Sequence, residues 1–194
     1  MFTGIIEFVG VVSEITKVNS NYTIRIASPI SNSLKIDQSV AHDGICLTVV
    51  QVGDNFHEVV AIDETIHRTT ISQWKTNKKI NLERCMLANG RFDGHIVQGH
   101  VDCTAQCEHI EDMNGSYKYW FIYPEKYHKL IIEKGSIAVN GTSLTVVDDK
   151  PGKFSVCIIP YTFEHTNFNS INKGDSVNIE FDILGKYINK FKEN

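Results

Sequence analysis

The chain repeats itself, and this repeat constrains the fold more than any other feature of the sequence. Residues 39–50 (SVAHDGICLTVV) match residues 136–147 (SIAVNGTSLTVV), an offset of 136 − 39 = 97 positions. The same offset pairs Glu83 with Glu180, and nearer the N-terminus the offset becomes 95. One register held over about forty residues indicates an internal duplication, with two halves of about 95 residues each.

Each half has the pattern of an all-β domain. Apolar and polar residues alternate in short runs such as residues 22–27, 45–52 and 155–159, which is typical of half-buried strands. Turn pairs separate the runs, including Asp43-Gly44 and Asn140-Gly141. Six or so short strands in about 90 residues favour a small closed barrel, because closure leaves no exposed strand edge.

A few helices are expected beside the strands. Short ones are predicted near Thr65 and Thr162, and another over residues 124–135, ending at Gly135. The last stretch, residues 183–194, differs because four apolar residues form one stripe at helical spacing: Leu184, Tyr187, Ile188 and Phe191. This stripe either packs on its own barrel or makes a subunit contact.

Composition excludes several classes of function. A net charge of −4 and 22% charged residues leave no basic surface for nucleic acid or acidic lipid. The apolar N-terminus lacks a preceding basic region, and no run reaches the ~20 apolar residues of a membrane helix, so a cytoplasmic protein is expected. Five cysteines without a secretion signal are expected to be free thiols.

The repeated Gly-x-[Cys/Ser]-Leu-Thr-Val motif is the strongest local signal of chemistry. In a strand, Cys46 and Thr48 share one face while Leu47 lies on the other, and the same alternation applies to Ser143 and Thr145. Such small polar residues can simply line a barrel rim. Because the polar pair occurs twice beside a glycine turn, with its apolar neighbours kept, we favour a face that binds a ligand.

No metal or nucleotide cofactor is expected. His95, His100, Cys103 and Cys107 cluster in the sequence, but their spacing matches no familiar zinc site. Walker, dinucleotide-binding and nucleophile-elbow motifs are not found in the sequence. Any reaction is therefore expected to be independent of such cofactors.

Four segments together resemble the riboflavin synthase family: residues 1–6 (MFTGII), the two repeated motifs, residues 94–102 (GHIVQGHVD) and residues 177–182 (VNIEFD). The resemblance covers essentially the whole chain. It implies six-stranded Greek-key barrels over residues 1–94 and 95–182, and a helix over residues 183–194 that assembles a homotrimer. It also implies a dismutation in which one 6,7-dimethyl-8-ribityllumazine gives four carbons to a second, yielding riboflavin and 5-amino-6-ribitylaminouracil.

The resemblance also implies the substrate-binding residues, two lumazines being bound at each active site between the first barrel of one subunit and the second barrel of its neighbour. The first pocket would comprise Ser39, Cys46, Leu47, Thr48, Val60, Ala61, Ile62, Asp63, Glu64 and Thr65. The second would comprise Gly99, His100, Val101, Lys134, Ser143, Leu144, Thr145, Ile159, Pro160, Tyr161, Thr162, Phe163 and Glu164. The segment Phe2, Thr3, Gly4, Ile5 and Ile6 belongs to the same ligand-contacting set.

The two halves differ in the groups that can move protons. At the equivalent positions, the second half has His100, Lys134, Ser143 and Asp182 where the first has Ile5, Asp37, Cys46 and Cys85. We therefore expect His100, Ser143, Cys46 and Asp182 to be catalytic, with His100 and Ser143 handling proton transfer and nucleophile activation at the second-half lumazine. In the alternative, His100 is only a hydrogen-bond donor, either to the ribityl chain or in a structural role.

Two other functions remain open at this point. A non-catalytic lumazine or flavin carrier of the antenna type would have a similar fold, although decay of one motif would then be expected. A flavin-reductase-type barrel is a weaker option, because no nicotinamide-binding domain follows. Association of the trimer with a lumazine synthase shell is a further possible partnership.

Overall fold

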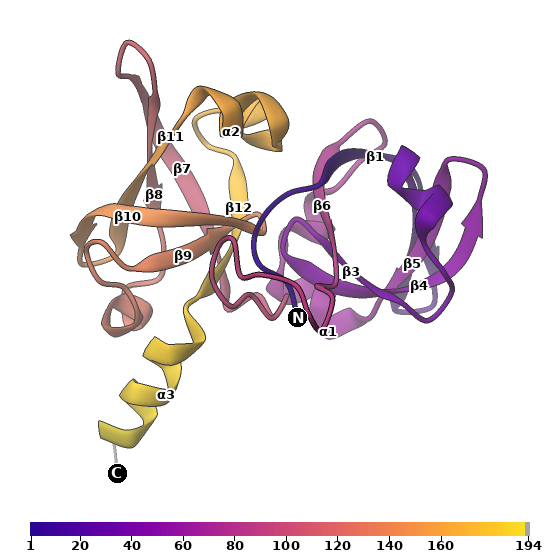
Figure 1. Ribbon diagram of the computed structural model, residues 1–194, viewed down its shortest axis with the longest axis horizontal. Coiled ribbons are helices and arrows are strands. Elements are labelled where there is room, and N and C mark those ends of the chain that lie inside the picture. Colours follow the sequence, from indigo (N-terminus) through magenta and orange to yellow (C-terminus); the bar gives the residue numbers. More distant parts are fainter. Residues whose placement is uncertain (193–194) are drawn as a thin grey trace.

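The computed structural model describes residues 1–192, and its main feature is two closed six-stranded antiparallel barrels lying side by side (Figure 1). The strands of the first barrel are β1 (Phe8–Val18), β2 (Asn21–Ala27), β3 (Ser39–His42), β4 (Ile45–Gly53), β5 (Phe56–Ala61) and β6 (Lys79–Arg84). Those of the second are β7 (Cys103–Asp112), β8 (Tyr117–Ile122), β9 (Ser136–Val139), β10 (Thr142–Lys150), β11 (Lys153–Ile158) and β12 (Ser176–Phe181). The predicted all-β duplication is confirmed.

Both barrels have the same strand order. The first runs β1-β2-β5-β4-β3-β6, and the second runs β7-β8-β11-β10-β9-β12, each closing on its first strand. Strands β3, β4 and β5 are consecutive neighbours and β6 returns beside β3, which is the Greek-key connection. Even the bulges correspond, since the register shifts between Val49 and Gln51 in β4 and between Val146 and Asp148 in β10.

Apolar side chains fill both barrels. Ile24, Ile26 and Val59 have no exposed surface in the first barrel, and Phe121 and Phe154 have none in the second. Each such side chain stabilises the fold by about 1.5–3 kcal/mol relative to exposure. Because the interiors are packed, a ligand has to bind on the outer walls or between the barrels.

The helices are short and lie mostly at the ends of the barrels. They are α1 (Asp63–Arg68), α2 (Pro160–His165) and α3 (Ile183–Lys192), with 3-10 helices η1 (Pro29–Ser33), η2 (Thr70–Gln73), η3 (Glu125–Leu130) and η4 (Asn167–Ser170). The helix predicted over residues 124–135 is thus only the 3-10 helix η3, because Ile131 becomes extended and enters the core. None of the helices in residues 1–192 is long and apolar enough to cross a bilayer.

Helix α3 projects away from both barrels (Figure 1). Its apolar stripe is uncovered: Leu184 is 62% exposed, Ile188 57% and Phe191 74%. The stripe therefore does not pack on its own barrel, which was one of the two alternatives. Residues 193 and 194 of the expected helix lie outside the described residues.

The barrels meet where the two repeated turns touch. Gly44 and Gly141 have φ of +78° and +76°, and a Cβ on either would lie 2.7 Å from the backbone nitrogen of the other. Glycine is required here for both reasons, since a left-handed conformation disfavours side chains and the backbones leave no room for a Cβ. The turn that opens each ligand motif is therefore also the contact between the halves.

A buried polar network surrounds this contact and follows the repeat. Asn81 donates from its backbone nitrogen to Asp43 Oδ1 at 2.7 Å and from Nδ2 to the carbonyl of Asn140 at 2.9 Å. Asn178 does the reverse, donating to Asn140 Oδ1 at 2.8 Å and to the carbonyl of Asp43 at 2.9 Å. This exchange relates the barrels by an approximate twofold rotation, and it explains why both asparagines occur at the same repeat position.

Asp43 breaks this symmetry, because the equivalent residue Asn140 carries no charge. Burial raises the pKa of Asp43 from 3.8 to about 7, although hydrogen bonds from Asn81 and Asn167 oppose the shift. A carboxyl whose pKa is raised on folding stabilises the folded state below the unfolded pKa. That contribution is lost as the pH rises from about 4 to about 7.

Asp43→Asn is therefore expected to flatten the pH dependence of unfolding between pH 4 and 7 and to raise stability above pH 7. Asn140 shows that an amide accepts the same backbone hydrogen bond. The difference in the free energy of unfolding should be on the order of 2–4 kcal/mol, because a tenfold change in proton affinity corresponds to about 1.4 kcal/mol. Urea unfolding at a series of pH values measures it. Parallel pH curves for the two proteins would contradict this role of Asp43.

Candidate functional site

The repeated motif lies at the start of β4 and of β10, with its polar side chains outside each barrel. In β4, Leu47 is buried whereas Cys46 is half-buried and Thr48 is exposed. In β10, Ser143 is half-buried and Thr145 is exposed. The predicted shared face is confirmed, and it places a thiol or hydroxyl beside a threonine on the outer wall of each barrel.

Each motif is covered by a loop from the other half of the duplication. The backbone nitrogen of Cys46 donates to the carbonyl of Gly99 at 2.9 Å, and that of Ser143 donates to the carbonyl of Gly4 at 2.8 Å. Both glycines have φ of +80°, and a Cβ would lie 2.6 Å from Cys46 Cβ at Gly99 and 2.5 Å from Ser143 Cβ at Gly4. Only glycine allows the loops to approach so closely.

Each loop thus covers the motif of the opposite half, and this arrangement corrects one expectation. We expected Gly99, His100 and Val101 to line the second-half pocket, but the structure places them against Cys46 of the first half. The cause is a short antiparallel bridge in which Phe2 and Val97 exchange backbone hydrogen bonds of 2.7 and 3.1 Å. The two loops pair with each other there, and each then continues to the opposite barrel.

Two buried glutamates hold the loops in place. Glu180 accepts hydrogen bonds from the backbone nitrogens of residues 98–100 at 2.7–2.9 Å. Glu83 accepts from the backbone nitrogens of Thr3 and Gly4 at 2.7 and 2.9 Å. Burial raises the pKa of both carboxyls, and the backbone donors oppose that shift. The sequence showed this pair only as a repeat match, and its positioning role was missed.

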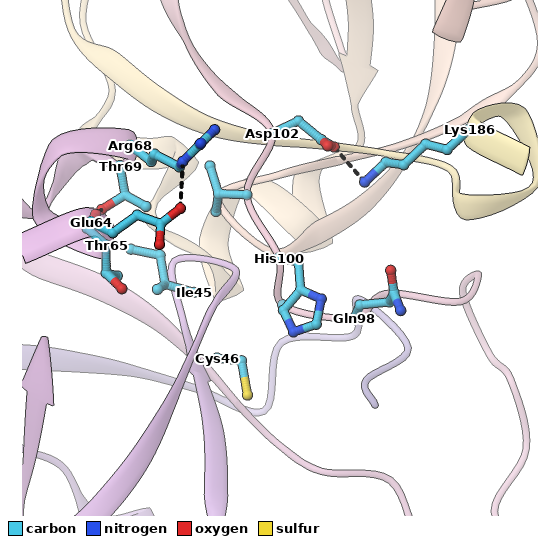
Figure 2. A pocket seen from close by; sticks show the side chains of 12 residues that line it. Ile45, Cys46, Glu64, Thr65, Arg68, Thr69, Gln98, His100, Asp102 and Lys186 are labelled. Carbon is cyan, nitrogen blue, oxygen red and sulfur yellow. Dashed lines mark hydrogen bonds and ion pairs between the residues drawn. The ribbon is translucent and has the colours of Figure 1, made fainter. Parts of the chain in front are cut away.

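The first-barrel pocket is a cavity of about 450 Å³ between the start of β4, helix α1 and the Gly99 loop. Its lining includes Cys46, Glu64, Thr65, Arg68 and His100. Figure 2 shows the side chains of His100 and Cys46 in the same part of the pocket, the first carried by the Gly99 loop and the second by the start of β4. The pocket thus brings together a thiol, an imidazole and hydroxyl groups, which suits both polyol binding and proton transfer.

Two ion pairs form the far side of this pocket. Glu64 pairs with Arg68 within α1 at 3.0 Å, and Asp102 pairs with Lys186 of α3 at 2.6 Å (Figure 2). Asp102 Oδ2 also accepts a hydrogen bond from the backbone nitrogen of Phe181 at 2.9 Å. The wall that carries His100 is therefore tied directly to α3. Arg68 and Lys186 were not predicted from the sequence, and Asp102 stood out only as the last residue of the motif at 94–102.

The second-barrel site has different groups at the equivalent positions. Ser143 Oγ lies 2.7 Å from Nδ1 of His95, a residue of the connection between the barrels. In place of the Glu64–Arg68 ion pair, α2 carries Tyr161 and His165, whose rings stack with centroids 4.0 Å apart. The duplicated scaffold thus supports two chemically distinct outer faces.

The remaining predicted ligand residues are distributed around these two faces. Val60 is half-buried, and Ile62, Asp63, Ile159, Pro160 and Glu164 are exposed, whereas Ala61 is in the core and can offer only backbone atoms. Ser39 lines a separate hollow of about 480 Å³ with Cys85. Lys134 occupies a left-handed turn with φ of +66° and lies outside the first-barrel pocket.

The His/Cys cluster of the sequence is dispersed in space. Cys103 and Cys107 are buried in the second barrel, where burial raises the pKa of Cys103 to about 12 and that of Cys107 to about 11. In residues 1–192, groups of three or more His, Cys, Asp or Glu side chains placed to hold a metal ion do not occur.

Comparison with known proteins gives consistent matches. The lumazine binding domain family matches residues 3–85 and 98–182, one copy per barrel. The riboflavin synthase of Actinobacillus pleuropneumoniae is 43% identical over 192 residues, covering 98% of this chain and 89% of that protein. That of Bacillus subtilis (strain 168) is 38% identical, with the same coverage of 98% and 89%.

A solved structure shows the same fold. LumP complexed with riboflavin superposes with a TM-score of 0.87 at 23% sequence identity, covering 93% of this chain and 99% of that one. Taken together, the paired lumazine-binding barrels and the identity over nearly the whole length show that the chain belongs to the riboflavin synthase family.

Proposed function

We propose that this chain is the enzyme that converts two molecules of 6,7-dimethyl-8-ribityllumazine into riboflavin and 5-amino-6-ribitylaminouracil. The observation that carries the proposal is the presence of two complete ligand faces, each with its polar strand pair and its own covering glycine loop. The curated relatives named riboflavin synthase support the same activity. A dismutation needs two copies of one substrate, and a duplicated binding domain provides two similar sites.

The proposed chemistry relies on positioning. The lumazine ring is electron-poor, so its 7-methyl group is acidic and the substrate serves as its own electron sink. Holding two such rings face to face can contribute up to ~7–11 kcal/mol. Proton transfers by positioned side chains add factors of about 10²–10⁴ each. His100 and Cys46 serve the first-barrel face and Ser143 serves the second, while Thr48 and Thr145 bind the ring or the ribityl chain.

The reaction is tested by incubating the purified protein with dimethylribityllumazine alone, without added metal or cofactor. Riboflavin and the pyrimidine product should form in equal amounts, with two lumazines consumed per riboflavin, as measured by absorbance and chromatography. Tight binding of lumazine without any riboflavin would instead indicate a carrier and would refute the proposed reaction.

We also propose that α3 assembles a homotrimer in which the first-barrel face of one subunit meets the second-barrel face of a neighbour. The uncovered stripe of Leu184, Tyr187, Ile188 and Phe191 provides the apolar surface for this contact. The Asp102–Lys186 ion pair would then link the subunit contact to the wall of the first-barrel pocket.

Ile188→Asp is expected to reduce the mass in solution from about three times 21.9 kDa to a single 21.9 kDa chain and to abolish riboflavin formation. A carboxylate in a buried apolar contact is unfavourable, and each active site would lose one of its faces. Light scattering and the riboflavin assay measure the two effects. The matched control is Ile36→Asp, the same substitution at a 63% exposed position of the first half, and it should leave both properties intact. A monomeric but fully active Ile188→Asp protein would contradict an active site shared between subunits.

A further inference from the structure

His95 is held against Ser143 by the main chain around it. Its Nδ1 lies 2.7 Å from Ser143 Oγ, and its backbone nitrogen donates to the carbonyl of Thr3 at 3.1 Å. The preceding residue, Gly94, is packed so tightly that a Cβ would lie 2.1 Å from the Thr3 carbonyl oxygen and 2.9 Å from Ser143 Oγ. The position of the imidazole is thus fixed by the same N-terminal loop that covers the second-barrel face.

The other histidine of this segment serves a different face. The backbone of His100 is anchored by Glu180, and its ring lines the first-barrel pocket. Within one subunit, the imidazole that lies at Ser143 is therefore that of His95, whereas His100 lines the first-barrel pocket.

The surroundings of His95 favour its neutral form at neutral pH. The ring is half-buried, and burial lowers its pKa below 6.5, while the carboxylate of Asp182 partly opposes that shift. A neutral imidazole can accept a proton, and the nearby carboxylate stabilises the imidazolium that results. Ser143 and the Thr3 carbonyl are its polar neighbours, and Asp182 is the charge that acts on it.

We propose that His95 accepts the proton of Ser143 and so makes Ser143 the proton-transfer group of the second-barrel face, with Asp182 balancing the charge. The proposal rests on the proposed riboflavin synthase function. In the forward step, Ser143 Oγ takes a proton from the 7-methyl group of the bound lumazine as its own proton passes to His95 Nδ1. The electron pair of the broken C–H bond delocalises into the ring, and the reverse transfers return the proton.

The first test compares the wild type with His95→Gln, whose amide can still hydrogen-bond Ser143 but cannot take up a proton. Lumazine bound in D₂O should exchange its 7-methyl protons at a rate about 10²-fold lower in the variant, as measured by NMR, while its affinity for lumazine changes little. The acid limb of the wild-type exchange profile should lie below pH 6.5 and should be absent from the variant. An unchanged exchange rate and pH profile would overturn the proposal.

A double-mutant cycle separates this relay from a structural role. If His95 acts through Ser143, His95→Gln should have little further effect on exchange in a Ser143→Ala background. The matched control uses a His100→Gln background. In that background, His95→Gln should still slow the exchange of the 7-methyl protons. Equal effects of His95→Gln in both backgrounds would refute the relay. Exchange that depends on His95 in a protein that forms no riboflavin would refute the proposed function and leave the relay standing.

Discussion

Gly141→Ala is expected to lower the free energy of unfolding by about 2–5 kcal/mol. The new Cβ would lie 2.7 Å from the backbone nitrogen of Gly44. Because the atom in the way belongs to the backbone, it cannot move aside as the end of a flexible side chain could. An alanine at φ of +76° adds about 1–2 kcal/mol, and forced overpacking adds about 1–3 kcal/mol. Because the same turn opens the β10 motif, riboflavin formation should fall as well. Urea unfolding followed by tryptophan fluorescence measures the stability change.

Gly174→Ala is the matched control for this effect. Gly174 also has a positive φ, +94°, but a Cβ added there would meet open space, with no heavy atom of a non-adjacent residue among residues 1–192 within 4 Å. Its cost should therefore be limited to the conformational part, about 1–2 kcal/mol. Similar losses in the two variants would show that the contact between the turns contributes nothing beyond backbone strain.

Glu180→Gln is expected to lower kcat for riboflavin formation by about 10²-fold and stability by about 1–3 kcal/mol. The carboxylate, only 3% exposed, accepts three backbone N–H groups from residues 98–100. In glutamine, one of the two accepting oxygens is replaced by an NH₂ group, which cannot accept a hydrogen bond from a backbone N–H. At least one N–H of residues 98–100 would then be unsatisfied, and the loop could shift. His100 and the wall of the first-barrel pocket would move with it. Steady-state kinetics and thermal unfolding measure the two effects.

Glu83→Gln tests the same principle at the other loop. It should loosen Thr3 and Gly4 and so disturb the Ser143 face instead of the Cys46 face. Glu133→Gln, at an exposed position in the second half, should leave both activity and stability unchanged. If Glu180→Gln retains full activity while losing stability, the anchor serves folding alone.

Much of the fold could be predicted from the sequence because the duplication presents each local pattern twice. Alternating apolar residues, turn pairs and the common offset together predicted two small barrels with the same strand plan. The short element after Pro124 was harder, since its apolar spacing fits a helix but Ile131 is drawn into the core after the single 3-10 helix η3. Local spacing could not reveal that competition.

The site was predictable as a motif but not as an arrangement. The alternation in the strand placed Cys46 with Thr48 and Ser143 with Thr145, and the structure confirms both pairs. The partners of these pairs come from segments about fifty residues away or more, and no periodicity links them. His95 was considered only as a metal ligand, because a serine partner 48 positions away leaves no local signal.

The sequence alone determined that this chain consists of two similar β-barrels with two copies of one ligand motif, because strand alternation and glycine turns are local properties. Only the tertiary structure decided which groups share a face. The pairing of Phe2 with Val97 makes the two glycine loops cross, so His100 serves the first barrel and Gly4 covers the second. This crossing of the loops depends on backbone hydrogen bonds between distant segments. Those bonds can form only when both barrels are folded and in contact.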